Sequence, residues 1–162
     1  MRLSLLPQPK SVRYSAGRLR LPRSGSIGIS DGRLEPVAAE AQALLGRAFS
    51  MAIAVPGVDD FLVVSLDPGL GREAYRLTID SKRIRIDAGA PAGAFYGVQT
   101  LRQILAQASA EAVPCLRIDD APDFQDRGVY YDVCRGRVPK LERLLEMVDT
   151  LAAYKINQVQ LY

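Results

Sequence analysis

The chain has 162 residues, of which 48% are hydrophobic and 24% charged, and its formal net charge is +3. This length suits one ordinary domain and excludes a complete α/β barrel, while the balance of residue types is that of a folded globular protein. The 21 lysines and arginines are scattered, and Arg83 and Arg85 alternate with isoleucines, which favours solvated strand faces over a nucleic-acid partner.

The N-terminal segment reaches Pro7 without the apolar core of a signal peptide, and no later segment approaches the roughly 20 apolar residues of a membrane span. We therefore expect a cytoplasmic protein with no membrane partner. Short strands are predicted at residues 12–14, 18–21 and 26–30, because turn-forming prolines and glycines bracket these segments.

An amphipathic helix is predicted from Pro36 to Phe49, because apolar residues recur there at three- and four-residue spacing. A second helix is predicted over residues 94–105 for the same reason. Further segments have the apolar continuity or alternation of strands: 61–66, 75–79 and 84–86. Residues 1–120 therefore predict an α+β domain, in which helices cover a mainly antiparallel sheet.

The pattern changes after a linker at Ala121-Pro122-Asp123. A strand is predicted at residues 129–133, a helix at 139–153 and a second strand at 157–162. Such a βαβ unit has parallel strands joined by a right-handed crossover. On its own it leaves most of its apolar surface uncovered, which indicates that further structure packs against residues 121–162.

The most informative candidate residue is Arg135, which follows the strand at 129–133. The carboxyl ends of parallel strands present the active sites of α/β folds, and a guanidinium there suits sugar hydroxyls or a carboxylate. Arg127 lies at the opposite end, where a structural role is favoured. Asp132 is interpreted as an ion-pair or hydrogen-bond acceptor rather than a catalytic group, with Arg127 or Lys155 as its partner.

Other reactive side chains favour structural interpretations. The chain contains no histidine, which excludes a Ser-His-Asp triad and a histidine metal site within it. Cys115 and Cys134 are predicted to be free thiols, and Cys134 has no histidine to activate it. Asp59-Asp60 and Asp119-Asp120 are predicted to be turn or cap residues. The residues thus assign no catalytic group and no metal ligand to this chain.

Three parts of the sequence resemble family 20 β-N-acetylhexosaminidases along nearly the whole chain. They are Leu6-Pro7-Gln8-Pro9-Lys10, then Arg83 to Ala88 leading through Gly93 to Leu101, and finally Arg127-Gly128, Asp132 to Arg135, Pro139 and Lys155-Ile156-Asn157. The last group is similar to the family pattern R-G-x-x-x-D-x-S-R followed by K-x-N. The resemblance implies the family's α+β N-terminal domain over residues 1–120 and a truncated β/α (TIM) barrel start over 121–162.

The resemblance also implies a function. Arg135 matches the arginine that binds hydroxyls of the non-reducing sugar, the partners are N-acetylhexosamine-terminated glycans or glycosides, and no cofactor is required. In this family the substrate's own acetamido oxygen attacks the anomeric carbon, assisted by an adjacent Asp-Glu pair. This sequence contains no Asp-Glu dipeptide, so the chain by itself is expected to be inactive. Cys134 replaces the usual serine, and Gly136 replaces a common histidine.

Two alternatives remain open from the sequence. Related glycosidases such as α-glucuronidases carry a similar N-terminal domain, and in those Arg135 would contact a uronic acid carboxylate. A non-catalytic carbohydrate-binding or scaffold module is the second alternative.

Overall fold

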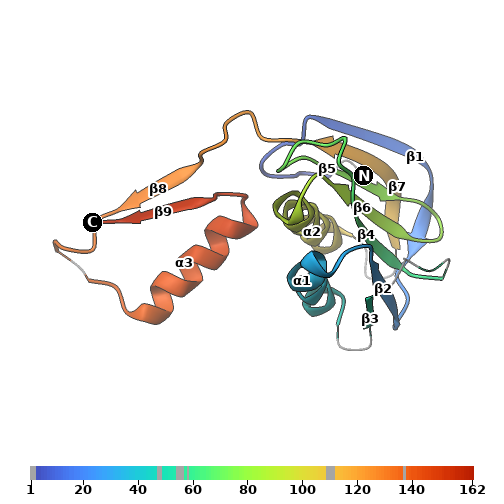
Figure 1. Ribbon diagram of the computed structural model, residues 1–162, viewed down its shortest axis with the longest axis horizontal. Helices are drawn as coiled ribbons and strands as arrows, with labels where there is room; N and C mark the ends of the chain where they lie inside the picture. The colour runs from blue at the N-terminus through green and yellow to red at the C-terminus, as the bar shows by residue number, and fades with distance from the viewer. Residues whose placement is uncertain (1–2, 47–48, 54–56, 58, 109–111, 137) are drawn as a thin grey trace. The chain divides into compact units, whose positions relative to one another are not determined.

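The computed structural model describes residues 3–46, 49–53, 57, 59–108, 112–136 and 138–162. The chain divides into two compact units, Met1–Ala121 and Pro122–Tyr162. Figure 1 shows the helices and strands of each unit. None of the helices in the described part of the chain has the length and apolarity to cross a membrane.

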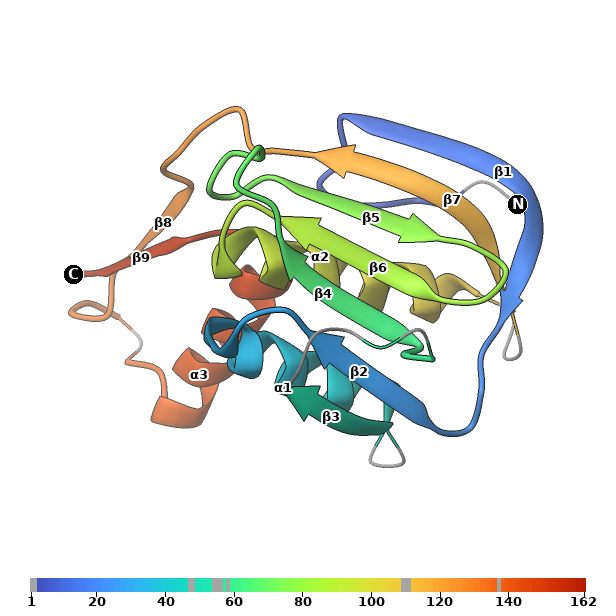
Figure 2. The same cartoon turned by 45° about the vertical axis from the view of Figure 1, so that its right-hand side comes forward.

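The first unit contains a seven-stranded mixed sheet in the order β1-β7-β5-β6-β4-β2-β3. Its strands are β1 (Ser11–Arg20), β2 (Gly25–Ile29), β3 (Phe49–Ile53), β4 (Leu62–Leu66), β5 (Tyr75–Ile79), β6 (Ile84–Ala88) and β7 (Ala112–Asp120). A short 3-10 turn, η1 (Gly32–Leu34), leads into helix α1 (Glu35–Leu45), and the second helix is α2 (Pro91–Gln107). Both helices lie on one face of the sheet, behind it in Figure 2.

The sequence predicted a mainly antiparallel sheet, but the sheet is mixed. The pairs β2–β3, β2–β4 and β4–β6 are parallel, whereas β1–β7, β5–β7 and β5–β6 are antiparallel. The prediction was wrong because it missed β3 and because β4 pairs in parallel with both β2 and β6. Strand β3 runs parallel to β2 and follows α1, so these elements form a crossover unit of the kind that parallel strands require.

The end of α1 explains why β3 was missed. We predicted a helix from Pro36 to Phe49, but α1 ends at Leu45 and Phe49 begins β3. Gly46 adopts a positive φ of 107° after the last helical residue, a non-helical conformation that glycine accepts readily, and the helix ends there. Ala48, which the predicted helix included, lies outside the described residues.

The hairpin predicted at 75–79 and 84–86 is confirmed as β5 and β6. Ile84 and Ile86 are fully buried, whereas Arg85 between them is exposed. The isoleucines therefore belong to the core beneath the helices, and the arginine faces solvent from the other side of the sheet. The predicted strands at 12–14 and 18–21 are one strand, β1, whose pairing with β7 shifts register between Tyr14 and Arg18.

The N-terminal segment is tied to α2 by two glutamines. Gln107 accepts a hydrogen bond from the Ser4 amide (2.8 Å) and donates one to the Ser4 carbonyl (2.7 Å). Gln103 accepts from the Leu6 amide (2.8 Å) and donates to the Leu6 carbonyl (2.6 Å). Each side-chain amide thus satisfies both backbone groups of one residue, as a neighbouring strand would. Ser4 and Leu6, the latter the first residue of the Leu-Pro-Gln-Pro-Lys motif, are thus bound to the helix.

The second unit is the predicted strand-helix-strand. Strands β8 (Gly128–Tyr131) and β9 (Gln158–Leu161) are parallel and are joined by helix α3 (Leu141–Ala153). The unit has no buried hydrophobic side chain among its described residues. Leu141 and Leu145, on α3, are 69% and 55% exposed. The apolar stripe that predicted this helix is therefore present but largely uncovered.

Candidate functional site

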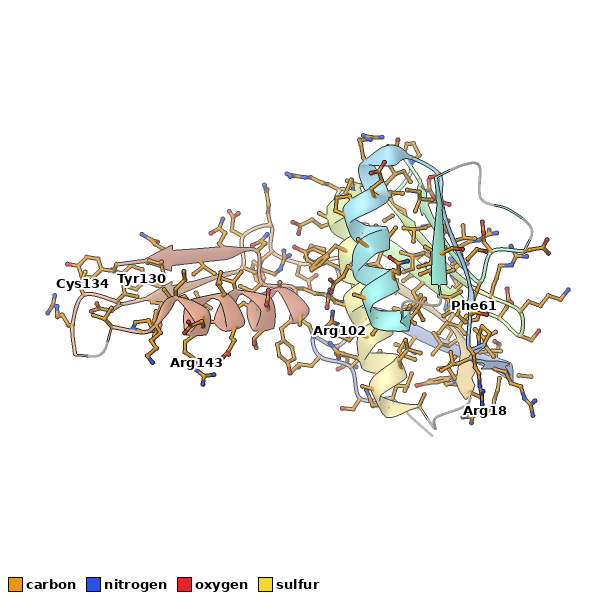
Figure 3. All side chains as sticks on the ribbon, turned by 90° about the horizontal axis from the view of Figure 1, so that it is seen from below. Arg18, Phe61, Arg102, Tyr130, Cys134 and Arg143 are labelled. Carbon is orange, nitrogen blue, oxygen red and sulfur yellow. The ribbon has the colours of Figure 1, made fainter. Side chains whose placement is uncertain are left out.

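The candidate site lies at the carboxyl ends of β8 and β9. Backbone pairing of the two strands continues past β8, because Tyr162 donates to the Tyr131 carbonyl (3.0 Å) and Val133 donates to the Tyr162 carbonyl (2.9 Å). After Val133 the chain enters the loop that carries Cys134 and Arg135. Figure 3 shows Cys134 in this loop and Tyr130 on the strand before it. Parallel strands place their carboxyl ends at one edge, where α/β folds present ligand-binding groups.

Arg135 is exposed in this loop, as its predicted place at the strand end requires. Its guanidinium makes no hydrogen bond and no ion pair with the residues that the structure describes. A guanidinium offers a rigid, forked set of hydrogen-bond donors to neighbouring oxygens, and here no described residue accepts from them. The neighbouring Cys134 is an exposed free thiol. What Arg135 binds stays a prediction.

Asp132 leaves the strand and turns back on the loop. Its Oδ1 accepts hydrogen bonds from the backbone N–H groups of Cys134 (2.8 Å) and Arg135 (3.3 Å). The interpretation of Asp132 as a hydrogen-bond acceptor is therefore supported. The predicted partners were wrong: among the described residues, neither Arg127 nor Lys155 pairs with it. The physical reason is that β8 ends at Tyr131. Asp132 therefore lies outside the strand, and its charge needs no ionic partner.

Arg127 closes the opposite, amino-terminal end of the strand pair. Its Nε donates to the Lys155 carbonyl (2.9 Å), and one terminal nitrogen donates to the carbonyls of Phe124 (2.6 Å) and Gln125 (3.2 Å). Its backbone N–H donates to Asn157 Oδ1 (2.9 Å), and the Asn157 N–H donates to the Arg127 carbonyl (3.0 Å). The arginine of the R-G motif and the asparagine of the K-x-N motif thus pin the two strands together, the structural role predicted for Arg127.

The glycines of the Gly93 to Leu101 motif set the distance between α2 and the sheet. A Cβ atom on Gly93 would lie 2.4 Å from the backbone oxygen of Ala74. A Cβ atom on Gly97 would lie 2.7 Å from Ile86 Cγ2. Both separations are shorter than real Cβ contacts, so only glycine fits at these positions without movement of the helix or its neighbours. The motif is therefore a packing device and carries no catalytic group.

Polar members of the same motif hold α2 in place. The Tyr75 hydroxyl lies 2.7 Å from Thr100 Oγ1 and donates to Asp120 Oδ2 at 2.9 Å. Burial raises the pKa of Tyr75 far above its ordinary value, so the hydroxyl stays protonated and able to donate. Gln99 Nε2 donates to Glu40 Oε1 (3.2 Å), which links α2 to α1. These contacts join the sheet and both helices.

The two carboxylate pairs serve structure. Asp60 is buried and accepts from the Gly57 N–H (2.6 Å), in keeping with the predicted turn role of Asp59-Asp60. Asp119-Asp120 is not in a turn or cap: both residues end strand β7, where the proline at position 114 obscured the strand pattern. The Arg117 guanidinium hydrogen-bonds Asp119 and holds the pKa of that carboxyl below its ordinary value. Within the described ranges no cluster of metal-ligating side chains occurs.

Known proteins resemble this chain along nearly its whole length. Residues 2–121 match the family described as "Glycosyl hydrolase family 20, domain 2". The N,N'-diacetylchitobiase of Vibrio harveyi is 33% identical over 168 residues, covering 98% of this chain and 18% of that protein. A β-N-acetylhexosaminidase of Cellulomonas fimi is 32% identical, covering 99% of this chain and 34% of that protein.

The fold also resembles that of solved structures. A mutant β-hexosaminidase of Streptomyces plicatus, in complex with its product GlcNAc, has a TM-score of 0.85 at 28% identity, covering 98% of this chain and 34% of that one. The present chain therefore spans about a fifth to a third of the length of these relatives.

Proposed function

The chain belongs to glycosyl hydrolase family 20, and on this premise we propose that it is part of an exo-acting β-N-acetylhexosaminidase, which removes terminal N-acetylhexosamine from glycans or glycosides. In this proposal residues 1–120 are the family's α+β N-terminal domain. Residues 121–162 are the first strand, helix and strand of the catalytic β/α barrel, and Arg135 binds hydroxyls of the terminal sugar.

The observation that carries the proposal is the position of Arg135. Its exposed guanidinium follows β8 at the carboxyl end of a parallel strand pair, and it has no partner among the described residues. In β/α barrels the catalytic and binding groups project from this end of the strands, whereas charges at the amino end serve stability. Arg127, with its hydrogen bonds to backbone carbonyls, fits the second description.

The uncovered surface of the second unit supports its assignment to a barrel. Parallel strands normally have both faces covered, yet Leu161 on β9 is 51% exposed, and Leu141 and Leu145 on α3 are exposed further. Each strand also pairs on one side only, because the sheet consists of β8 and β9. Neighbouring strand-helix units of a closed barrel would cover the apolar side chains and pair both open edges.

The chemistry of the proposed reaction requires groups that this sequence does not contain. The acetamido oxygen of the substrate is the nucleophile, an aspartate orients the acetamido group, and the adjacent glutamate protonates the leaving oxygen. Placing the nucleophile within the substrate makes the attack intramolecular, which can lower the barrier by about 7–11 kcal/mol. Since the sequence has no Asp-Glu dipeptide, we expect the 162-residue chain alone to be inactive.

The alternatives have less support. Relatives that match nearly the whole chain are named as a chitobiase and a β-N-acetylhexosaminidase, which favours a hexosaminidase over an α-glucuronidase and over a non-catalytic module.

The test begins with the sequence that follows codon 162 in the gene, which should encode further βα repeats and an Asp-Glu pair. The complete gene product should release the aryl group from an aryl N-acetylglucosaminide. Arg135→Ala should lower kcat/KM about 10- to 100-fold, since hydrogen bonds to a charged group contribute about 1.5–3 kcal/mol. Arg143→Ala, which removes an exposed arginine of α3, is the matched control and should change little.

Two results would contradict the proposal. One is a complete protein that lacks the Asp-Glu pair and hydrolyses no N-acetylhexosaminide. The other is an equal loss of activity in Arg135→Ala and Arg143→Ala, because the effect would then not depend on the strand-end position.

A further inference from the structure

The loop that carries Arg135 is closed by a single carboxylate. Asp132 Oδ1 accepts the N–H groups of Cys134 (2.8 Å) and Arg135 (3.3 Å), so it holds the backbone at the residue that bears the free guanidinium. Carboxylate acceptors make stronger bonds to backbone N–H groups than neutral acceptors do. Within the described residues the Asp132 carboxylate has no cationic side-chain partner, so these two bonds are what it contributes.

The start of the loop, before Arg135, is tied to β9. There the Val133 N–H donates to the Tyr162 carbonyl (2.9 Å) at the end of β9. After Arg135, Gly136 has a φ of 72°, in the left-handed region, and turns the chain. Arg135 therefore has an anchored backbone and an unengaged side chain, the arrangement expected of a group that awaits a ligand.

We propose that Asp132 is a positioning residue for Arg135: by binding the two loop amides, it holds the guanidinium at the carboxyl edge of β8 in a geometry ready for the sugar. The inference rests on the proposed function, because it concerns the residue assigned there to sugar binding. Fixing the backbone before binding reduces the ordering cost when the sugar binds, so the benefit appears as affinity.

This role differs from that of a catalytic carboxylate in one testable respect. An acceptor oxygen is sufficient to bind the two amides, and asparagine keeps an acceptor oxygen at the same place. Asparagine cannot give or take a proton. Asp132→Asn should therefore preserve the function of a positioning residue and abolish that of a proton-transfer residue, whereas Asp132→Ala removes both.

The first experiment uses the 162-residue chain and measures amide hydrogen exchange of Cys134 and Arg135 by NMR. Asp132→Ala should accelerate both amides about 2- to 10-fold, the range expected for loss of one net hydrogen bond each. Asp132→Asn should exchange much more slowly than Asp132→Ala and only slightly faster than the original chain, because its neutral amide oxygen is the weaker acceptor. Asp149→Ala, which removes an exposed carboxylate from α3, is the control and should leave the loop unchanged. Equal exchange in Asp132→Ala and the original chain would overturn the inference.

The second experiment uses the complete gene product and an aryl N-acetylglucosaminide. Asp132→Ala should raise KM about tenfold with kcat little changed, and Asp132→Asn should restore KM. The double variant with Arg135→Ala should be no worse than Arg135→Ala alone, because both changes remove the same contact with the sugar. Additive losses, or an asparagine variant as weak as the alanine variant, would overturn the inference. Failure of the proposed function would show differently, as absence of activity in the unmodified protein.

Discussion

Gly93→Ala tests whether the motif on α2 sets the spacing between helix and sheet. The new Cβ would lie 2.4 Å from the Ala74 oxygen and 3.1 Å from the Ala74 carbonyl carbon, so helix or strand must move by about 1 Å to reach ordinary contact. Both sides of this contact are backbone, which places the cost near the upper end of the about 1–3 kcal/mol typical of overpacking. Better helix propensity returns at most about 1 kcal/mol, so we expect a net loss of about 2 kcal/mol.

The measurement is the free energy of unfolding in urea, with Gly71→Ala as the matched control. A Cβ on Gly71 would lie 3.8 Å from Ala74 Cβ, an ordinary contact, and this substitution should change stability by less than about 0.5 kcal/mol. If Gly93→Ala is as stable as the original chain, or if both variants lose the same amount, close packing is not the reason for glycine at position 93.

Three further predictions concern charged side chains. Arg127→Ala removes three hydrogen bonds to backbone carbonyls and should destabilise the second unit by about 2 kcal/mol, seen as faster exchange of the β8 and β9 amides with the first unit unchanged. Asp119→Asn should lower stability at pH 7, because hydrogen bonding to Arg117 depresses the pKa of Asp119; the deficit should shrink as pH falls below the ordinary 3.8. Asp87→Asn should instead raise stability at pH 7, because burial raises the pKa of Asp87 and its ionised form opposes folding; the gain should vanish near pH 3. Urea unfolding at pH 7 and pH 3 separates the two carboxyl groups, and the same sign for both variants at pH 7 would contradict these assignments.

The sequence was sufficient where a strong period continued over a whole element. The stripe of α2 and the alternation of β5 and β6 were predicted, and the structure buries Ile84, Ile86 and Leu101 accordingly. It was insufficient where one residue interrupted the pattern. Pro114 lies within β7, an inner strand of the sheet, beside the register shift in β1, and proline in a strand normally argues against that assignment.

At the candidate site, the strand-end position of Arg135 was predictable, but the role of Asp132 was not. The predicted strand ran to Val133 and placed Asp132 within an apolar strand, whereas β8 ends at Tyr131. Strand ends are set by pairing with a partner strand, here β9, and by the turn that follows. Whether the strand ends before or after the aspartate decides whether that aspartate requires an ionic partner or caps a loop. The residue type alone does not reveal which.

The glutamine contacts of the N-terminal segment have a practical consequence for protein production. Leu3 and Leu5 pack against the core, and the backbone of Ser4 and Leu6 is bound by Gln107 and Gln103. An expression clone that begins only at the first strand would expose apolar surface along α2. The side-chain amides of Gln103 and Gln107 would then bond to water instead of to the backbone. Affinity tags are therefore better joined through a spacer ahead of residue 3 than in place of this segment.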